Sequence, residues 1–270
     1  MGNGERMATF IEVDTALSLR DYSTDSDNTV CLVIDVIRAS STIVSLLDNG
    51  CRRVYTVAEE EKARQLGRER KMLTSGEWQG IKLPGFDLDN SPAEARTFPV
   101  RDRDVVLCTS NGTRVIDKAK NCVQLFIASL LNARSCAAAG LSAARAASCG
   151  ITIVCAGQYG KFVLDDAYCA GYLLQEMELE AQKLGVELRE SDACRAAKAL
   201  VKAYPDARTA FLESASGKVL LGTGGTEDFA CCLEANTSQA VPYLQLEDDL
   251  IWFVNWQDKL VNNRREKHDG

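Results

Sequence analysis

The sequence predicts an α/β fold in which helices cover a mostly parallel sheet. Short apolar runs typical of buried strands alternate along the chain with longer runs typical of helices. Three of the apolar runs, at 30–34, 105–107 and 151–154, each pass into a loop of small polar residues and then into a helix start. Because the carboxyl ends of parallel strands lie at one edge of a sheet, we expect these three loops to meet there.

In the first part of the chain, a polar stretch at 21–28 separates the first strand from the rest. The helix after the second strand should end at Asn49-Gly50, since this pair is a good helix stop. Ser91 to Glu94 has the pattern of a capping box with Pro at the first helical position, whereas 75–92 is otherwise expected to be a loop. The expected strands are 10–13, 30–34, 54–57 and 71–74, and the expected helices are 40–48 and 58–70.

The second part of the chain continues the alternation. Asn132 is expected to cap an Ala-rich helix that runs to about 148, and a long helix over 165–184 should end before Gly185. Two more helices are expected within 192–214. The remaining expected strands are 105–108, 123–128, 151–155, 241–246 and 250–255, and the remaining expected helices are 113–120 and 227–235.

The length of 270 residues suits one large α/β domain or two lobes of ordinary size. Recurrence of the strand–loop–helix unit suggests two similar halves. We therefore expect an N-terminal strand and loop over 1–27, a first α/β half over 28–135 and a second over 136–270, with the site between the halves or within one compact unit.

The charge and composition exclude several classes of partner. A formal net charge of −7 argues against nucleic acid or an anionic membrane, and the longest apolar runs are too short to span a bilayer. The first residues lack the features of a signal peptide, and the eleven cysteines show no C-x-x-C spacing. We therefore expect a cytoplasmic protein with reduced thiols, and the sequence leaves its oligomeric state open.

The only histidine is His268, in the polar C-terminal tail. Serine–histidine and cysteine–histidine nucleophile systems, histidine phosphatases and histidine-based zinc sites would all need this residue. The sequence therefore favours chemistry without histidine.

Each of the three loops ends at a cation, namely Arg38, Arg114 or Lys161. A loop of small residues before a helix presents free backbone N–H groups, and an added cation makes the place suitable for an anion. We expect the three loops to hold a small, highly charged anion.

Two acidic positions accompany these cations. Asp35 ends a buried strand, where a carboxylate either ligates Mg²⁺ or attacks phosphorus, or else binds only loop amides. Asp165-Asp166 opens the long helix, where acids complement the helix dipole but also make a metal site, for which we choose Asp166. A haloacid-dehalogenase-type phosphatase would need a second Asp at position 37, which is Ile.

The loop over 109–114 is the candidate phosphate cradle. Asn111-Gly112 permits a tight turn, hydroxyl groups surround it, and Arg114 can pair with two oxygens; an ordinary strand-to-helix turn is the alternative. Cys108 and Arg114 also have the spacing of cysteine-dependent phosphatases, although Leu107 stands where those enzymes carry His. The glycine-rich run 222–226 is interpreted as a turn, because Glu227-Asp228 would repel a phosphate.

Taken together, these motifs resemble the 2-phosphosulfolactate phosphatase family, the Mg²⁺-dependent phosphatases of coenzyme M biosynthesis and their relatives. Five segments carry the resemblance in the family's order: 34–42, 76–77, 85–92, 109–114 and 155–171. The sequence departs from the family pattern at four positions, with Trp78 and Lys161 in place of Arg, Asp89 in place of Gly and Asp165 in place of Glu.

The resemblance implies a three-layer α/β/α fold with mostly parallel sheets, two similar halves and a site between them. It also implies a Mg²⁺-dependent phosphatase that hydrolyses phosphate esters of 2-hydroxycarboxylic acids, chiefly 2-phosphosulfolactate to sulfolactate and phosphate. A cysteine-dependent phosphatase that uses Cys108 and Arg114, and a non-catalytic anion-binding protein on the same scaffold, stay open as alternatives.

Each candidate site residue has an expected role. The expected catalytic residues are Asp35, Arg38, Asn111, Arg114 and Asp166. The expected substrate-binding residues are Ser40, Ser41, Asn90, Ser91, Thr109, Ser110, Gly112, Thr113, Gly157, Gly160 and Lys161. The expected metal ligands are Asp35, Glu77, Asp87 and Asp166, with Mg²⁺ as the cofactor.

Overall fold

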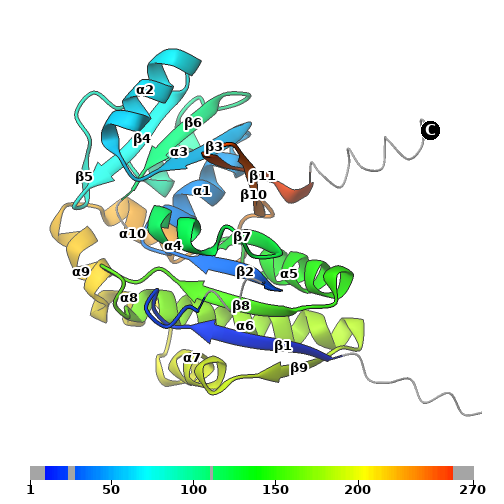
Figure 1. The fold of residues 1–270 in the computed structure, drawn as a ribbon. Coiled ribbons are helices and arrows are strands. Elements are labelled where there is room, and N and C mark those ends of the chain that lie inside the picture. Colours follow the sequence, from blue (N-terminus) through cyan, green and yellow to red (C-terminus); the bar gives the residue numbers. More distant parts are fainter. Residues whose placement is uncertain (1–9, 24–27, 110–111, 258–270) are drawn as a thin grey trace, which may run out of the picture.

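The structure, a computed structural model, describes residues 10–23, 28–109 and 112–257 (Figure 1). The strands within these ranges are β1 (Phe10–Ala16), β2 (Thr29–Ile34), β3 (Arg53–Val57), β4 (Leu73–Trp78), β5 (Ile81–Lys82), β6 (Asp104–Cys108), β7 (Gln124–Ala128), β8 (Gly150–Cys155), β9 (Glu187–Glu190), β10 (Pro242–Glu247) and β11 (Leu250–Asn255). The helices are α1 (Ala39–Asp48), α2 (Glu60–Arg70), α3 (Pro92–Thr97), α4 (Gly112–Ala119), α5 (Ala133–Ala147), α6 (Leu164–Leu184), α7 (Asp192–Ala203), α8 (Ala207–Glu213), α9 (Ala215–Gly222) and α10 (Thr226–Cys232).

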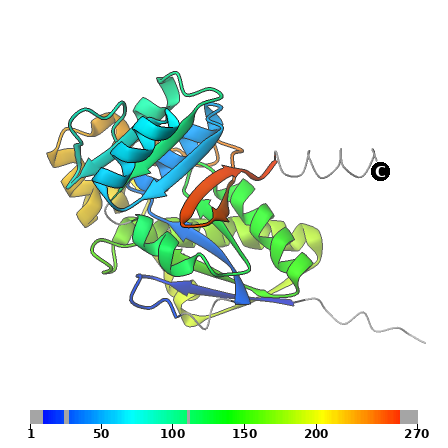
Figure 2. The ribbon, with the colours of Figure 1, turned by 45° about the horizontal axis from the view of Figure 1, so that its top comes forward.

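The described strands form one sheet in the order β5-β4-β6-β3-β11-β10-β7-β2-β8-β1-β9. Two groups of parallel strands, β4-β6-β3 and β7-β2-β8-β1-β9, make up most of it. The antiparallel hairpin β10–β11 joins the groups, because β11 pairs with β3 and β10 pairs with β7 (Figure 2). The predicted mostly parallel α/β sheet is therefore confirmed.

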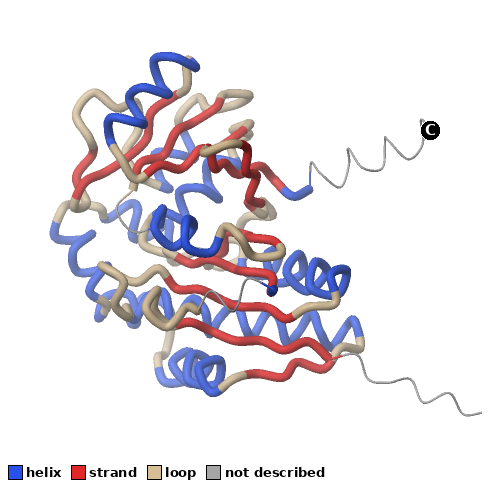
Figure 3. The backbone as a smooth tube through the Cα atoms, viewed as in Figure 1, coloured by secondary structure: helices blue, strands red, loops and turns tan. Residues whose placement is uncertain are grey.

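Helices cover both faces of each parallel group, as the helix and strand layers in Figure 3 show. On β2, Leu32 packs toward α5 and α6, whereas Val33, on the opposite face, packs toward α1 and α4. The same α1–α4 layer covers one face of β3 and β6, whose other face packs against α2. Each group is thus a three-layer α/β/α arrangement, and the two groups share their middle helices.

Most elements lie close to where the sequence predicts them, and the differences have physical causes. The stretch 75–92, expected to be a loop, contains the end of β4 and the short strand β5, whose residues are exposed and so lack the apolar pattern of a strand. Strand β9 has the charged sequence ELRE and lies at the edge of the sheet, where little apolar burial is required. Asn132 precedes α5 as expected, but its side chain binds Ser129, Ile127 and Ala240 backbone groups instead of capping the helix.

Strands from all three predicted segments lie side by side in this sheet. Strand β1, from the N-terminal segment, pairs with β8 and β9, and β2 pairs with β7 and β8. The division at 27/28 and 135/136 stays a prediction. The described helices include none whose length and apolar content would let it cross a lipid bilayer.

Candidate active site

A cavity of about 310 Å³ lies at the carboxyl ends of β2, β6 and β8, next to the β4–β5 hairpin and α9. Figure 1 shows the hairpin and α9 on the same side of the molecule. The cavity is lined by Asp35, Ile37, Arg38, Glu77, Gln79, Gly80, Asn90, Thr109, Gly157, Gln158, Tyr159, Asp165, Asp166, Ser216, Val219 and Leu220. The three strand–loop–helix units therefore meet as the sequence predicts.

The loop after β2 places Asp35 and Arg38 in the cavity wall. Its shape depends on two buried hydroxyl groups: Ser40 accepts a hydrogen bond from the Asp35 backbone N–H, and Ser41 donates one to the Val36 carbonyl. The peptide bond between Ile37 and Arg38 is cis. Ser40 and Ser41, predicted to bind substrate, therefore lie behind the cavity wall and stabilise the loop.

The carboxyl group of Asp35 is strongly perturbed by its surroundings. Burial raises the pKa of Asp35 to about 8, and the nearby charges of Asp165 and Glu77 add to the rise. A backbone N–H at Ala39 and the Arg38 guanidinium oppose it. The cavity thus concentrates acidic groups that a cation would stabilise.

Asp166 joins two of the loops. Its Oδ1 accepts a hydrogen bond of 2.9 Å from the Val36 N–H, and its Oδ2 accepts one of 2.9 Å from the Gly157 N–H. Burial raises the pKa of Asp166 well above its ordinary value, and Asp165 and Asp35 add to the rise. Because both oxygens are used by the backbone, Asp166 positions the loops of β2 and β8.

Its neighbour Asp165 is the carboxylate with free oxygens. The side chain is buried against the cavity, and neither oxygen has a hydrogen-bond partner among the described residues. Burial raises the pKa of Asp165 to about 6, and its own backbone N–H and the nearby hydroxyl groups of Ser216 and Ser214 moderate the rise. We chose Asp166 from the sequence as the ligand of a cation, but this geometry favours Asp165.

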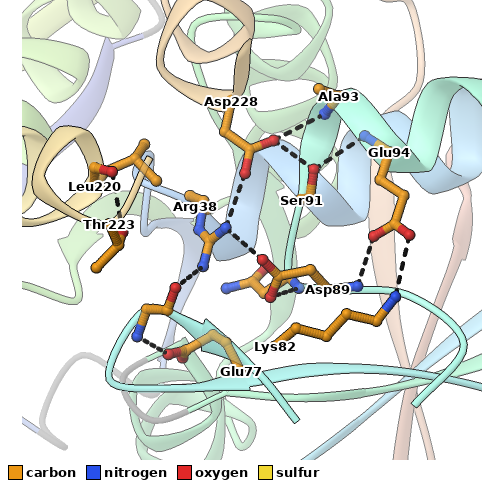
Figure 4. Close-up of polar contacts among 12 residues, drawn as sticks. Arg38, Glu77, Lys82, Asp89, Ser91, Ala93, Glu94, Leu220, Thr223 and Asp228 are labelled. Atoms are coloured by element: carbon orange, nitrogen blue, oxygen red, sulfur yellow. Dashed lines mark hydrogen bonds and ion pairs between the residues drawn. The ribbon is translucent and has the colours of Figure 1, made fainter. Parts of the chain in front are cut away.

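Arg38 lies in a buried ion-pair network, drawn in Figure 4. Its Nη1 donates to Asp89 Oδ2 at 2.9 Å and to Asp228 Oδ2 at 2.8 Å, and its Nη2 donates to the Gly80 carbonyl at 3.4 Å. Burial lowers the pKa of Arg38, but the charge of Asp89 and its bonds with Asp228 more than offset this, so the pKa is raised overall. Arg38 is a permanently charged guanidinium in the cavity wall.

The loop after β6 contributes Thr109 to the cavity lining. The Thr113 hydroxyl donates to the Thr109 carbonyl at 2.8 Å and so connects Thr109 to the first turn of α4. A Cβ atom at Gly112 would lie 3.0 Å from Asp35 Oδ2, so a residue without a side chain lets α4 begin this close to Asp35. Ser110 and Asn111 lie outside the described residues, and Arg114 is exposed on α4 and is not part of the cavity lining.

Two tight turns form the rim. Gln79 and Gly80 connect β4 to β5 with positive φ angles of 53° and 80°, and Tyr159 and Gly160 form a similar turn after β8 with φ angles of 54° and 73°. At Gly157, where φ is +65°, a Cβ would lie 1.9 Å from the Lys161 carbonyl oxygen. Lys161 is exposed and, like Gly160, does not line the cavity.

The segment between β4 and α3 has a divided role. Asn90 is buried in the cavity wall, and its Oδ1 has no hydrogen-bond partner among the described residues. Glu77 lines the cavity and accepts a hydrogen bond from the Gly80 N–H, whereas Ser91 caps α3 and donates to Asp228. Asp87 is exposed outside the cavity, where its Oδ2 accepts hydrogen bonds from the N–H and hydroxyl of Thr74.

The acidic wall has the donor chemistry that Mg²⁺ requires. Among the described residues, no three His, Cys, Asp or Glu side chains lie close enough together to form a metal centre. However, Mg²⁺ is commonly bound by one or two carboxylates plus water and substrate oxygens. The free oxygens of Asp165 and the acidic surroundings of Asp35 fit that coordination.

Cys108 does not have the environment of a nucleophile. Its side chain is buried outside the cavity lining, and burial raises the pKa of the thiol to about 11, with the charges of Glu60 and Glu77 adding to the rise. A nucleophilic cysteine needs a lowered pKa. The structure therefore argues against the cysteine-dependent alternative.

Several lining residues were not expected from the sequence: Ile37, Gln79, Gly80, Gln158, Tyr159, Ser216, Val219 and Leu220. The Gln-Gly and Tyr-Gly pairs were a possible signal, since both permit tight turns. The α9 residues have no sequence pattern that predicts a role in the site, because tertiary packing alone brings α9 to this edge of the sheet.

Comparison with known proteins gives the same family for the family model and for the relatives. The family model described as 2-phosphosulpholactate phosphatase matches residues 17–247. The chain is 37% identical over 217 residues to a probable 2-phosphosulfolactate phosphatase of Thermus thermophilus, covering 80% of this chain and 88% of the relative. Proteins with the same description from Symbiobacterium thermophilum (35% over 223 residues; 79% and 90% covered) and Pseudothermotoga lettingae (36% over 228 residues; 84% and 93% covered) are similarly close.

Proposed function

Because the chain belongs to the 2-phosphosulfolactate phosphatase family and is thus a phosphoric monoester hydrolase, we propose that its cavity hydrolyses phosphate esters of 2-hydroxycarboxylic acids. The reference substrate is 2-phosphosulfolactate, which would give sulfolactate and phosphate. In this reaction the oxygen of a water molecule bonds to phosphorus, and the bond between phosphorus and the 2-oxygen of the acid breaks. One proton of that water ends on the released 2-hydroxyl group.

The observation that carries the proposal is the meeting of Asp35, Arg38 and Asp165 in one cavity. Arg38 would bind the oxyanions of the ester, since a guanidinium pairs well with phosphate or carboxylate oxygens. Thr109 and Asn90 add neutral polar groups in the same wall. These groups fit a reaction in which catalysis depends on positioning and charge stabilisation.

We further propose Mg²⁺ as the cofactor, held by Asp35 and Asp165. When bound, Mg²⁺ would neutralise charge on the phosphoryl oxygens. Glu77 lies in the same wall and contributes to the acidic surroundings of Asp35. Asp166 would act indirectly, by holding the loops that carry Asp35 and Gly157.

A screen of phosphate release tests the proposal. Wild-type protein would be assayed on 2-phosphosulfolactate, phospholactate and phosphoglycolate, with Mg²⁺ and with EDTA. We expect release only with Mg²⁺, and a loss of at least about 100-fold in Asp35→Asn. A matched control is Asp192→Asn, which makes the same chemical change at a carboxylate that is 98% exposed on α7.

The outcomes separate the alternatives. A protein that binds these esters but releases no phosphate from any of them would instead be the non-catalytic anion-binding protein. Turnover that persists in EDTA would contradict the role of Mg²⁺. A phosphoryl group trapped on Asp35 during turnover would make Asp35 the nucleophile, whereas its absence with active enzyme would favour direct attack by water.

We propose that the enzyme acts in the cytoplasm. The eleven cysteines are all free thiols in the structure, in keeping with a reducing compartment.

A further inference from the structure

The glycine-rich segment before Glu227 brings a second acidic residue, Asp228, to Arg38 from α10. The sequence suggested that acids here would repel a phosphate. Instead, Asp228 is buried and its Oδ2 lies 2.8 Å from Arg38 Nη1. The segment therefore contributes to the site through Arg38.

Asp228 is itself firmly held. Its Oδ1 accepts hydrogen bonds from the Ser91 hydroxyl and, at 3.2 Å, from the Ala93 N–H (Figure 4). These contacts fix the carboxylate against the start of α3, so its other oxygen is directed at Arg38. Phe229, the next residue of α10, is buried and anchors the helix in the core.

The contacts of Arg38 use its N–H groups unequally. A guanidinium has five N–H groups. Both hydrogens of Nη1 are taken, one by Asp228 and one by Asp89, and Nη2 gives one to the Gly80 carbonyl. Among the described contacts, the Nε–H and one of the two Nη2–H groups are left for a ligand.

We propose that Asp228 is a positioning residue: together with Asp89, it orients Arg38 so that the remaining N–H groups of the guanidinium bind oxygens of the substrate's phosphate or carboxylate. This inference rests on the proposed phosphatase function. Guanidinium N–H groups form strong, charge-assisted hydrogen bonds with such oxyanions. Two carboxylates on Nη1 hold the guanidinium in one orientation.

The positional role and a purely electrostatic role predict opposite results. Arg38 lies between two carboxylates, so removing the charge of Asp228 would leave the site more positive. A purely electrostatic role therefore predicts tighter binding of an anionic ester in Asp228→Asn. A positional role predicts weaker binding, because Asn has a single accepting oxygen, and its N–H₂ group would then face either Arg38 or the donors at the start of α3.

The test measures KM and kcat for 2-phosphosulfolactate in Asp228→Asn, with inhibition by inorganic phosphate as a second measure of binding. We expect KM to rise roughly tenfold or more and kcat to change by less than about threefold. Glu227→Gln is the matched control, because it removes a carboxylate from the adjacent, exposed position of the same helix. This control should behave as wild type.

A double-mutant cycle shows whether Asp228 acts through Arg38. In an Arg38→Lys background, which lacks the planar guanidinium that Asp228 orients, Asp228→Asn should change KM by less than about threefold. An unchanged or lowered KM in Asp228→Asn, or an equal effect in both backgrounds, would overturn the inference. Inactivity of the wild type on every ester would instead reject the proposed function, and this inference with it.

A second variant keeps the test decisive if Asp228→Asn does not fold. Asp89 contributes the other carboxylate and is more exposed, at 20% against 8% for Asp228. Asp89→Asn should raise KM in the same direction and show the same coupling to Arg38→Lys. Independence of Asp89 and Arg38 in that cycle would likewise overturn the inference.

Discussion

Asp166 and Val36 are 130 residues apart in sequence, yet the Asp166 carboxylate accepts a 2.9 Å hydrogen bond from the Val36 backbone N–H. The second carboxylate oxygen binds the Gly157 N–H at the same distance. One side chain at the start of α6 thus satisfies two backbone donors and connects the loops that follow β2 and β8. Asp165, the preceding residue, has no such bonds among the described residues.

Substitution of these two neighbours should therefore affect stability in opposite ways. Asp166→Asn replaces one acceptor oxygen by an N–H₂ group facing a backbone N–H, and we expect a loss of about 1–3 kcal/mol in the free energy of unfolding. Asp165→Asn removes a buried charge without partners, so it should leave stability unchanged or raise it. Urea denaturation of both variants at pH 7 in EDTA measures this. Equal destabilisation would contradict the separate roles.

The pair also shows what the sequence could and could not reveal. Two adjacent acids at a helix start identified the place but not the partner of each, because one position along a helix turns a side chain by about 100°. The meeting of the three loops was predictable, since it follows from parallel strands. The contribution of Ser216 and Leu220 was not, because α9 reaches the cavity only through packing of the C-terminal segment.

The cationic residues of the site were predicted only in part. Arg38 was identified from its position after β2, and the structure adds the two carboxylates that hold it. Arg114 and Lys161 also follow strands, but an exposed cation and a buried one have the same local sequence pattern. Hydrophobic periodicity does not fix where the end of a long side chain lies, so only the fold distinguishes them.

Variants of Arg38 and Arg114 should separate their roles. We expect Arg38→Ala to lower kcat/KM by about 100-fold or more, because it removes the one cation among the described residues that line the cavity. Arg114→Ala should lower kcat/KM by less than about threefold, since this side chain is exposed outside the lining. Steady-state kinetics with 2-phosphosulfolactate decide the matter. A large loss in Arg114→Ala would restore its predicted catalytic role.

Acid sensitivity should arise in part from Asp104, at the start of β6. Burial would raise the pKa of Asp104, but hydrogen bonds from Arg52 and Arg53 lower it below its ordinary value overall. The folded protein therefore binds this proton less readily than the unfolded chain. The ion pairs therefore stabilise the fold fully at pH values above the pKa that Asp104 has in the unfolded chain. This stabilisation is lost as the pH falls through the lower pKa that Asp104 has in the folded protein.

Comparison of Asp104→Asn with wild type over pH 2–7 checks this pH dependence. Because Arg52 is 59% exposed and solvent screens its charge, we expect the variant to be less stable at pH 7 by only about 1 kcal/mol. The difference should shrink below about pH 4. Asp248→Asn, at an exposed carboxylate in the β10–β11 turn, is the control. A difference that is constant with pH would show that the ion pairs are not its cause.

Cys108→Ser should have little effect on turnover, whereas EDTA should abolish it. The thiol lies outside the cavity lining and its pKa is raised to about 11, so almost no thiolate exists near neutral pH. A buried Cys-to-Ser change adds a polar hydroxyl to the core, so we expect a modest loss of stability, about 1–2 kcal/mol, with kcat retained. Phosphate-release assays of wild type and variant, each with Mg²⁺ and with EDTA, complete the comparison. Loss of turnover in Cys108→Ser together with activity in EDTA would establish cysteine-dependent chemistry and reject the Mg²⁺ site at Asp35 and Asp165.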